Sequence, residues 1–327
     1  MTRDAPTPDS TPLAAGSVSL RLYPHDVSAC EQLDLIRSQA EAAVSAGYDG
    51  VMVSEHHANF PGYLPNPIQL AGFLLGSMSG GWAAPCPLLL PMRAYALVAE
   101  DLAWLDAAYP GRVGAGFAAG ALPVDFELAE VPFGEIIERF KQSLPKVVGA
   151  LRGRDTSPLG ADRAIARTAE NPLPMVVAAQ SPAAVRRAAA LNLGVLYDSL
   201  QTAEATARLG AVYREAHGTA PRIAIRRVWI GDPPAERMAQ QMEHYRSYAP
   251  QRAMKNWEGD QLIAAAAGAE AADKLADFLA SADCDTVNVR IHVSGLEPAM
   301  VDEQLRYHAE EFLPRLRQRM ETLPSSD

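Results

Sequence analysis

Hydrophobic and polar positions divide most of the chain into two alternating kinds of segment. Short runs rich in valine, leucine and isoleucine are typical of buried strands, and longer stretches with apolar residues at helical spacing follow them. The first run covers 18–23, and the next stretch places Leu33, Ile36 and Ala40 on one helical face before Gly47 ends it. The alternation continues to the carboxyl end and predicts an α/β protein with a parallel sheet.

Eight strands are predicted, at 18–23, 49–54, 85–91, 112–117, 175–179, 194–197, 223–230 and 286–292. Helices are expected at 30–46, 67–75, 94–108, 134–151, from 182 onward, 202–216 and 299–318. Eight strands alternating with helices over roughly 300 residues indicate a (β/α)8 barrel. The rival topology, a doubly wound open sheet, usually has a glycine-rich loop after its first strand. Here that place holds Tyr23-Pro24-His25-Asp26, which favours the barrel.

The predicted domain organisation is simple. Residues 1–16, rich in Thr, Pro and Asp, predict a disordered lead-in without the apolar region of a signal peptide. Residues 17–320 are expected to form one barrel domain. The stretch 232–270, after the seventh strand, is too long for a simple strand-to-helix loop and predicts an insertion that serves as a lid.

Composition narrows the classes of partner. A net charge of −10 without a basic cluster argues against nucleic acid, and no apolar run approaches the ~20 residues of a membrane span. The three cysteines, Cys30, Cys86 and Cys284, show no paired spacing and indicate a reducing cytoplasm.

The first candidate for chemistry is Glu55-His56-His57, where the second strand leaves the sheet. Active sites of parallel α/β proteins gather at this end, and a buried carboxylate beside two imidazoles needs partners. A metal-dependent hydrolase or lyase is one alternative, which stoichiometric zinc would support. Adjacent strand residues point to opposite faces, however, so we expect no metal between His56 and His57.

Taken together, the motifs resemble the bacterial luciferase-like monooxygenase family of flavin-dependent enzymes from about Val18 to Arg317, most weakly over 232–270. The matching residues, in chain order, are Glu55-His56-His57, Asn66-Pro67, Leu74-Leu75-Gly76, Leu90-Pro91, Glu100-Asp101, Leu105-Asp106, 111–116, Asp125-Phe126, 179–181 and Phe312-Leu313-Pro314. The resemblance rests on the ordered set, since each pair alone is common.

The resemblance assigns roles to four positions. It implies that His56 lies near the flavin and moves a proton in the oxygen chemistry. We interpret Glu55 and His57 as buried structural partners that hold the loop. The resemblance places Cys86–Pro87 where the family has a cis peptide that supports the flavin ring, and we expect this X-Pro bond to be cis. Cys86 is a catalytic candidate, although a small buried thiol is the plainer interpretation.

The flavin phosphate is expected at Gln180-Ser181, where a helix begins at Pro182 and its free amides suit an anion. An ordinary serine N-cap explains the same residues. The family's fourth strand ends in an arginine that contacts this phosphate, whereas this chain has Ala118-Ala119-Gly120. The resemblance therefore leaves two alternatives, reduced FMN bound weakly and supplied by a separate reductase, or a deazaflavin coenzyme.

Further pocket candidates stand at or near predicted strand ends: Tyr197 for the cofactor, and Tyr23, His25 and His292 for a small organic substrate. The leading functional hypothesis is a monooxygenase that uses reduced FMN and dioxygen. The alternatives are deazaflavin-dependent hydride transfer and a noncatalytic flavin-binding relative. A homodimer is expected from the resemblance alone.

Overall fold

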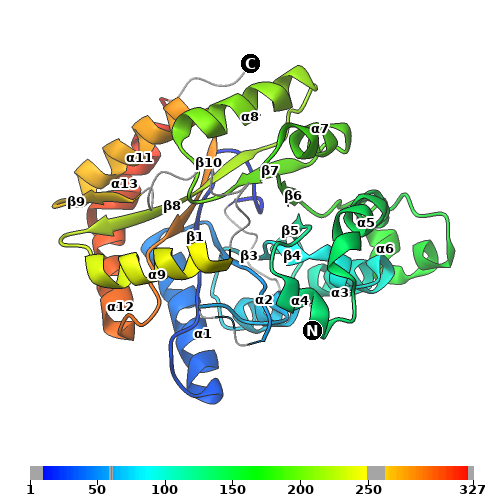
Figure 1. The fold of residues 1–327 in the computed structure, drawn as a ribbon, viewed down its shortest axis with the longest axis horizontal. Helices are drawn as coiled ribbons and strands as arrows, with labels where there is room; N and C mark the ends of the chain where they lie inside the picture. The colour runs from blue at the N-terminus through cyan, green and yellow to red at the C-terminus, as the bar shows by residue number, and fades with distance from the viewer. Residues whose placement is uncertain (1–9, 59, 61, 249–261, 323–327) are drawn as a thin grey trace.

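The computed structural model describes residues 10–58, 60, 62–248 and 262–322. Nine strands form a nearly closed parallel barrel in the order β3-β2-β1-β10-β8-β7-β6-β5-β4 (Figure 1). They are β1 (Val18–Arg21), β2 (Gly50–Val53), β3 (Trp82–Pro85), β4 (Leu88–Leu89), β5 (Ala115–Ala118), β6 (Met175–Ala178), β7 (Gly194–Tyr197), β8 (Arg222–Ile230) and β10 (Thr286–Arg290). A bridge between Ala83 and Val113 joins β3 to the residues that lead into β5. The predicted TIM-type barrel is confirmed.

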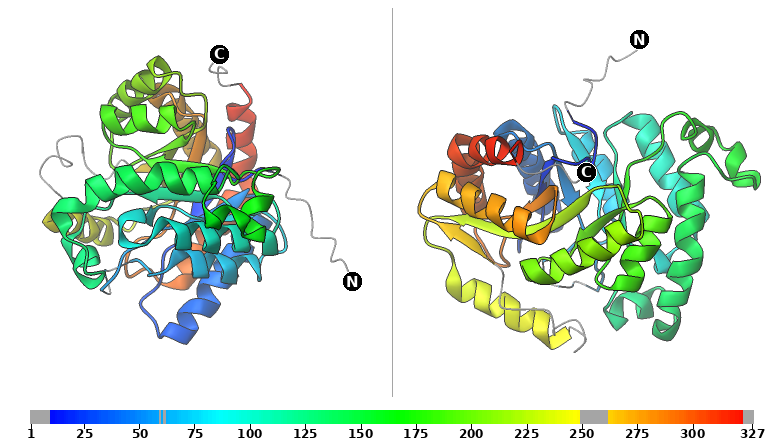
Figure 2. Two further views of the ribbon diagram at one scale, coloured as in Figure 1. Left: turned by 90° about the vertical axis from the view of Figure 1, so that its right-hand side faces the viewer. Right: turned by 90° about the horizontal axis from the view of Figure 1, so that it is seen from above.

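Helices surround the strands, as the two views of Figure 2 show. They are α1 (Ala29–Ala46), α2 (Pro67–Leu75), α3 (Tyr95–Ala108), α4 (Pro123–Leu128), α5 (Ile136–Ala150), α6 (Arg163–Arg167), α7 (Pro182–Ala190), α8 (Ala203–Glu215), α9 (Ala235–Tyr248), α11 (Gly268–Ala282), α12 (Pro298–Tyr307) and α13 (Leu313–Met320). A π-helical turn at His308–Phe312 joins α12 to α13. Among the described residues, every helix is too short or too polar to span a lipid bilayer.

Alternate strand residues belong to two separate layers. The larger core lies between the sheet and the helices and includes Val51 on β2 and Val195 on β7. A smaller cluster fills the barrel interior with Met52, Trp82 and Leu196. Because side chains alternate across a strand, the two layers reveal which residues point inward at the carboxyl ends.

The structure corrects several predicted boundaries. The third strand begins at Trp82 instead of residue 85, because Trp82-Ala83-Ala84 precedes the proline-framed leucine run on which the prediction relied. The predicted connector 152–174 contains α6, and α11 was not predicted. The stretch 232–270 contains a helix, α9, and a short strand, β9 (Ile263–Ala265). Strand β9 pairs in parallel with β8. Residues 249–261 of the predicted lid lie outside the described residues.

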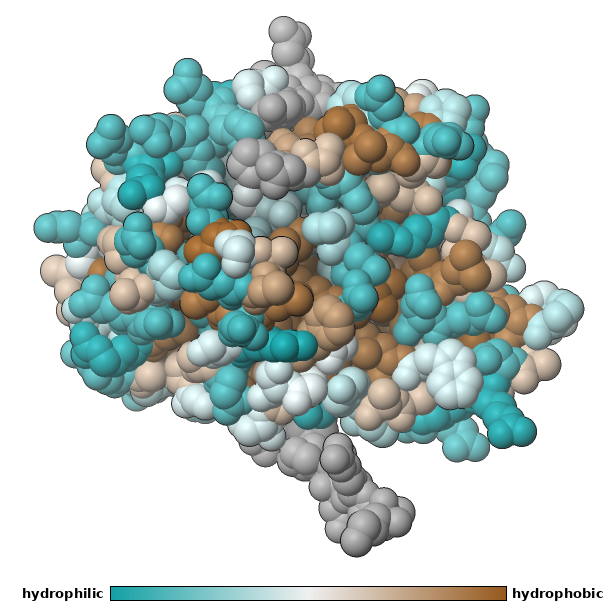
Figure 3. Space-filling view, turned by 90° about the horizontal axis from the view of Figure 1, so that it is seen from below, coloured by the Kyte–Doolittle hydropathy of each residue, from teal (hydrophilic) through white to brown (hydrophobic). Residues whose placement is uncertain are grey.

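The surface mixes polar and apolar side chains. On the face shown in Figure 3, apolar residues lie between hydrophilic ones. Among the described residues, the exposed large hydrophobic side chains are Leu97, Trp104, Leu128, Phe133 and Ile137.

Candidate active site

The carboxyl ends of the strands bring chemically active side chains together at the barrel mouth. On β1, the inward positions Ser19 and Arg21 continue to Tyr23, since Leu20 belongs to the outer layer. On β10, the inward Asn288 is followed by Arg290 and His292 in the same way. Arg21 Nε donates to Asn288 Oδ1 at 2.7 Å, which links the two neighbouring strands beneath the mouth.

Glu55 organises the loop after β2. Its carboxylate accepts from Leu89 N at 2.7 Å, contacts His57 Nε2 at 3.0 Å and forms an ion pair with Arg93 at 2.5 Å. Burial raises the pKa of Glu55, but the hydrogen bonds from His57 and Arg93 outweigh it and hold the pKa below its usual value. Glu55 is therefore an ionised structural anchor. Glu55 is buried, as expected, whereas His57 is partly exposed, and the two side chains contact each other within the loop.

His56 forms a dyad with a carboxylate from another loop. Its Nδ1 lies 2.8 Å from Asp125 Oδ2, and the buried Asp125 also accepts from His57 N at 2.8 Å. Asp125 lies on α4, after β5. A carboxylate on Nδ1 fixes the tautomer and leaves Nε2 to exchange a proton. The imidazole is partly exposed and packs against Phe60 and Tyr63, with ring centroids 4.9 and 4.5 Å away.

The peptide bond between Cys86 and Pro87 is cis, as the sequence predicted. This bulge separates β3 from β4 beside the loop after β2, and Arg21 Nη1 donates to the Cys86 carbonyl at 3.0 Å. The Cys86 side chain points into the barrel, where burial raises its pKa to about 12. The thiol therefore stays protonated at neutral pH and is a poor nucleophile.

Small residues line the mouth next to the bulge. Ala118 ends β5, Ala178 ends β6, and Ala119 and Gly120 follow β5; all four are partly exposed. Gly116, below them on β5, faces Cys86 so closely that a Cβ would lie 2.2 Å from the thiol sulfur. The side chains that line this sector, between the bulge and β6, therefore project little from the backbone.

The α7 N-terminus stands beside the same sector. Ser181 caps the helix by accepting from Ala184 N at 3.3 Å, with Pro182 at the first helical position. Gln180 connects two loops, because its amide donates to Leu196 O at 3.1 Å and accepts from Asp198 N at 3.2 Å. Helix amides at this point suit a phosphate, although the serine cap that the sequence offered as the alternative is present as well.

The small side chains and the helix amides of this sector are of the kind that suits a flavin. The bulge and the small side chains of β5 and β6 would hold the ring, and Ser181 with the α7 amides would hold the phosphate. Of the predicted cofactor residues, Pro87, Ala118, Ala119, Gln180 and Ser181 surround this one sector.

Tyr197 lies elsewhere. It belongs to the core between sheet and helices, where burial and the nearby Cys284 raise its pKa, whereas its neighbour Leu196 faces the interior. The structure thus separates Tyr197 from the other predicted cofactor residues. The predicted substrate residues Tyr23, His25 and His292 do lie together, since the His292 ring is 5.5 Å from Tyr23 and 5.0 Å from His25.

Sequence reasoning assigned no role to Asp125, Arg21 or Arg290. Asp125 appeared only as half of a motif pair, and Arg290 only as part of a strand. Among the described residues, no group of three or more His, Cys, Asp or Glu side chains gathers as metal ligands. His56 and His57 turn to different carboxylates, Asp125 and Glu55.

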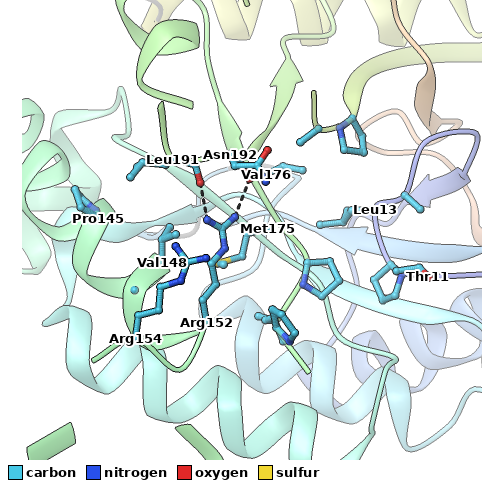
Figure 4. A pocket seen from close by; sticks show the side chains of 18 of the residues that line it. Thr11, Leu13, Pro145, Val148, Arg152, Arg154, Met175, Val176, Leu191 and Asn192 are labelled. Atoms are coloured by element: carbon cyan, nitrogen blue, oxygen red, sulfur yellow. Dashed lines mark hydrogen bonds between the residues drawn. The ribbon is translucent and has the colours of Figure 1, made fainter. Parts of the chain in front are cut away.

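A cavity of about 740 Å³ lies at the opposite end of the barrel, below the starts of β6 and β8 (Figure 4). There Arg152 donates to the carbonyl oxygens of Leu191 and Asn192 at 2.6 and 2.7 Å, beside Arg154. These bonds satisfy the last carbonyls after α7, which gives Arg152 a structural role. The amino-terminal face of such barrels contributes to stability, and catalysis belongs at the other face.

Comparison with solved structures supports the fold. Monooxygenase RslO1 from Streptomyces bottropensis superposes with a TM-score of 0.73 at 20% identity, covering 91% of this chain and 99% of that one. The oxygenating constituent of 3,6-diketocamphane monooxygenase from Pseudomonas putida, solved with FMN, has a TM-score of 0.69 at 19% identity, covering 92% and 99%. An F420-dependent secondary alcohol dehydrogenase has a TM-score of 0.67 at 13% identity, with the same coverage of 92% and 99%.

The family is established by sequence. A family model described as luciferase-like monooxygenase matches residues 13–315. The chain belongs to the luciferase-like monooxygenase family, as the resemblance indicated.

Proposed function

We propose that this member of the luciferase-like family is the oxygenating component of a monooxygenase that binds reduced FMN and acts with dioxygen on a small organic substrate. The observation behind the proposal is the position of the His56–Asp125 dyad next to the Cys86–Pro87 bulge and the small-residue sector. A candidate proton-transfer group thus lies beside a surface of small side chains that suits a flat cofactor.

A bound reduced flavin supplies the electrons that activate dioxygen, and the chain supplies positioning and proton transfer. Asp125 accepts a hydrogen bond from Nδ1–H of His56. This leaves Nε2 free to accept or return a proton at the reacting oxygen. Water is excluded in part by aromatic contacts between the loop after β2 and α9. Tyr63 Oη lies 3.4 Å from Tyr245 Oη, and the Phe60 ring lies 5.2 Å from His244.

The sequence of the β5 end supports a supply of reduced flavin by a separate reductase. Ala118-Ala119-Gly120 provides no cation for a phosphate, so the phosphate would rest on α7 amides and Ser181 alone. Weak binding of this kind suits a flavin that arrives reduced and leaves oxidised.

The absence of this cation also leaves open a second candidate, hydride transfer with the deazaflavin coenzyme F420, which one of the structural neighbours uses. Anaerobic titration of the protein with reduced FMN and with reduced F420, followed by absorbance and fluorescence, distinguishes the two. We expect saturable binding of reduced FMN and at least tenfold weaker binding of reduced F420. The reverse order would replace the monooxygenase proposal with the F420 candidate, and binding of neither would reject both.

A pair of variants tests where the ring binds. Ala118→Trp fills the small-residue sector and should weaken FMN binding at least tenfold. Ala280→Trp introduces the same side chain at an exposed position of α11 and should leave the affinity unchanged. Equal affinities for the two variants, with both proteins folded by circular dichroism, would place the ring elsewhere.

A further inference from the structure

Arg290 is a buried cation that forms no ion pair with any carboxylate in the described part of the chain. The side chain follows Asn288 on the inward face of β10 and is 2% exposed. Its Nη2 donates to Tyr245 Oη at 2.7 Å, and its Nε makes a long contact of 3.4 Å with the His292 carbonyl. Within the described part of the chain, Nη1 has no hydrogen bond and no acidic side chain forms an ion pair with this guanidinium.

The neighbours of Arg290 are mainly aromatic. Its Cζ lies 4.5 Å from the Tyr23 ring centroid and 5.5 Å from that of Tyr245, and Tyr63 packs edge-on against Tyr23 at 5.4 Å. Cation–π contacts offset part of the cost of burial but leave the charge in place, because a guanidinium does not deprotonate in a protein. A buried charge of this kind normally has an anionic partner.

His292, two residues later, is also a buried polar side chain without hydrogen-bond partners in the described structure. The imidazole is 3% exposed, and neither ring nitrogen has a hydrogen-bond partner in the described structure. Its neighbour His25 differs, since His25 Nδ1 lies 3.1 Å from Leu296 O and Nε2 lies 2.6 Å from Gln39 Nε2. Burial, together with His25 and Arg290, lowers the pKa of His292 well below 6.5, so the ring is neutral with one donor and one acceptor.

Asp198 is a carboxylate near these groups, and it already accepts a hydrogen bond from the backbone. Asp198, after β7, accepts from Leu200 N at 2.8 Å. Burial raises the pKa of Asp198, while Arg226, Arg290 and Arg21 act in the opposite direction. The structure shows no ion pair between Asp198 and Arg290, so the guanidinium keeps a free charge-assisted donor.

We propose that Arg290 and His292 form a subsite for the carboxylate of a small aromatic acid, which makes organic acids the substrate class. The Arg290 Nη1 donors pair with the carboxylate, the N–H of His292 adds a second donor, and the Tyr23 and Tyr63 rings pack against the body of the acid. This inference rests on the proposed function, in which the substrate lies beside the cofactor in the barrel mouth.

The subsite is separate from the expected phosphate position. Arg290 ends β10, whereas Ser181 follows β6, and β8 and β7 lie between these strands in the barrel. The cofactor phosphate would bind at Ser181 and the substrate carboxylate at Arg290, so the two anions do not compete for one site. The neutral aromatic wall beside Arg290 favours an aromatic acid over an inorganic anion.

The test compares benzoate with benzamide, its neutral analogue of the same shape, on the full-length protein. Calorimetry on the wild type should show saturable binding of benzoate and at least tenfold weaker binding of benzamide. Arg290→Gln should weaken benzoate binding at least tenfold, and Arg290→Lys should recover part of the loss. Arg154→Gln removes the same charge from the exposed arginine at the opposite end of the barrel and should have no effect.

A measurement on the wild type avoids dependence on variants that fail to fold. With histidines labelled for NMR, benzoate should shift the ring signals of His292, assigned through His292→Gln, and benzamide should not. Absence of this shift, or equal benzoate affinity in the folded Arg290→Gln and wild-type proteins, would overturn the subsite. FMN binding is measured separately by absorbance. If benzoate binds at Arg290 and FMN does not bind, the subsite stands and the monooxygenase proposal fails. If FMN binds and benzoate does not, the monooxygenase proposal stands and the subsite fails.

Discussion

Single residues decide the chemistry at the barrel mouth, and the His56–Asp125 pair is the clearest case. His56 Nδ1, in the loop after β2, lies 2.8 Å from Asp125 Oδ2 on α4, and this contact orients a partly exposed imidazole as the proposed proton transfer requires. Cys86 shows the contrasting effect of environment. Its thiol lies a few residues from the same mouth, yet burial keeps it protonated and packed against Gly116.

Asp125→Asn should slow the reaction of dioxygen with flavin-loaded protein by about 10²-fold, the typical contribution of a positioned acid–base group. The amide keeps the size of the carboxylate but does not hold the Nδ1–H tautomer of His56. Stopped-flow absorbance measures the rate, and the FMN affinity should change less than threefold. If the two residues act as a unit, His56→Gln combined with Asp125→Asn is no slower than either alone. Additive losses would contradict the dyad.

A second residue-scale prediction concerns stability and pH. His308 is fully buried against Tyr48, with Nδ1 2.6 Å from the hydroxyl, and burial lowers its pKa to about 3. The unfolded chain, with a histidine pKa near 6.5, binds the proton first as the pH falls, so stability decreases between about pH 6.5 and 3. From pH 7 to 5 the loss due to His308 is about 2 kcal/mol. Urea unfolding at both pH values should show a smaller loss for His308→Gln, and an unchanged loss would assign the pH dependence to other groups.

At the scale of elements, close contact between β3 and β5 shapes the small-residue sector. Gly116→Ala places a Cβ 2.2 Å from Cys86 Sγ and should destabilise the protein by about 1–3 kcal/mol through overpacking. Gly134→Ala, where nothing lies within 4 Å of the added Cβ, is the matched control and should change stability by less than about 0.5 kcal/mol. Thermal or urea unfolding measures both. Equal stability of the two variants would mean that the bulge shifts freely away from β5.

The elements also show what the sequence reveals and what it hides. Periodicity located most of the barrel strands, because a parallel sheet covered on both sides needs continuous apolar runs. The same continuity hides which side chain faces inward, and this is why Tyr197 was placed at the cofactor and Arg290 was overlooked. Asp125 was not predicted as a site residue for a different reason. Its distance from His56 depends on how the segments after β2 and β5 pack against each other. Local signals were sufficient for the serine cap at Ser181, whereas the cis bond before Pro87 was expected from the family resemblance.

For the whole molecule, we propose from the exposed apolar side chains of α3 that the protein forms a homodimer. Leu97 and Trp104 are 60% and 53% exposed and stand seven residues apart, on one side of the helix. Large exposed apolar side chains on one face are typical of an interaction surface, and a second copy of the chain offers the same face to cover them. We therefore expect the wild type to sediment as a dimer at micromolar concentration. Leu97→Glu should shift it to monomer by burying a carboxylate at the interface, whereas Ala280→Glu on α11 should leave the dimer intact. A wild type that sediments as a monomer would assign these side chains to another partner.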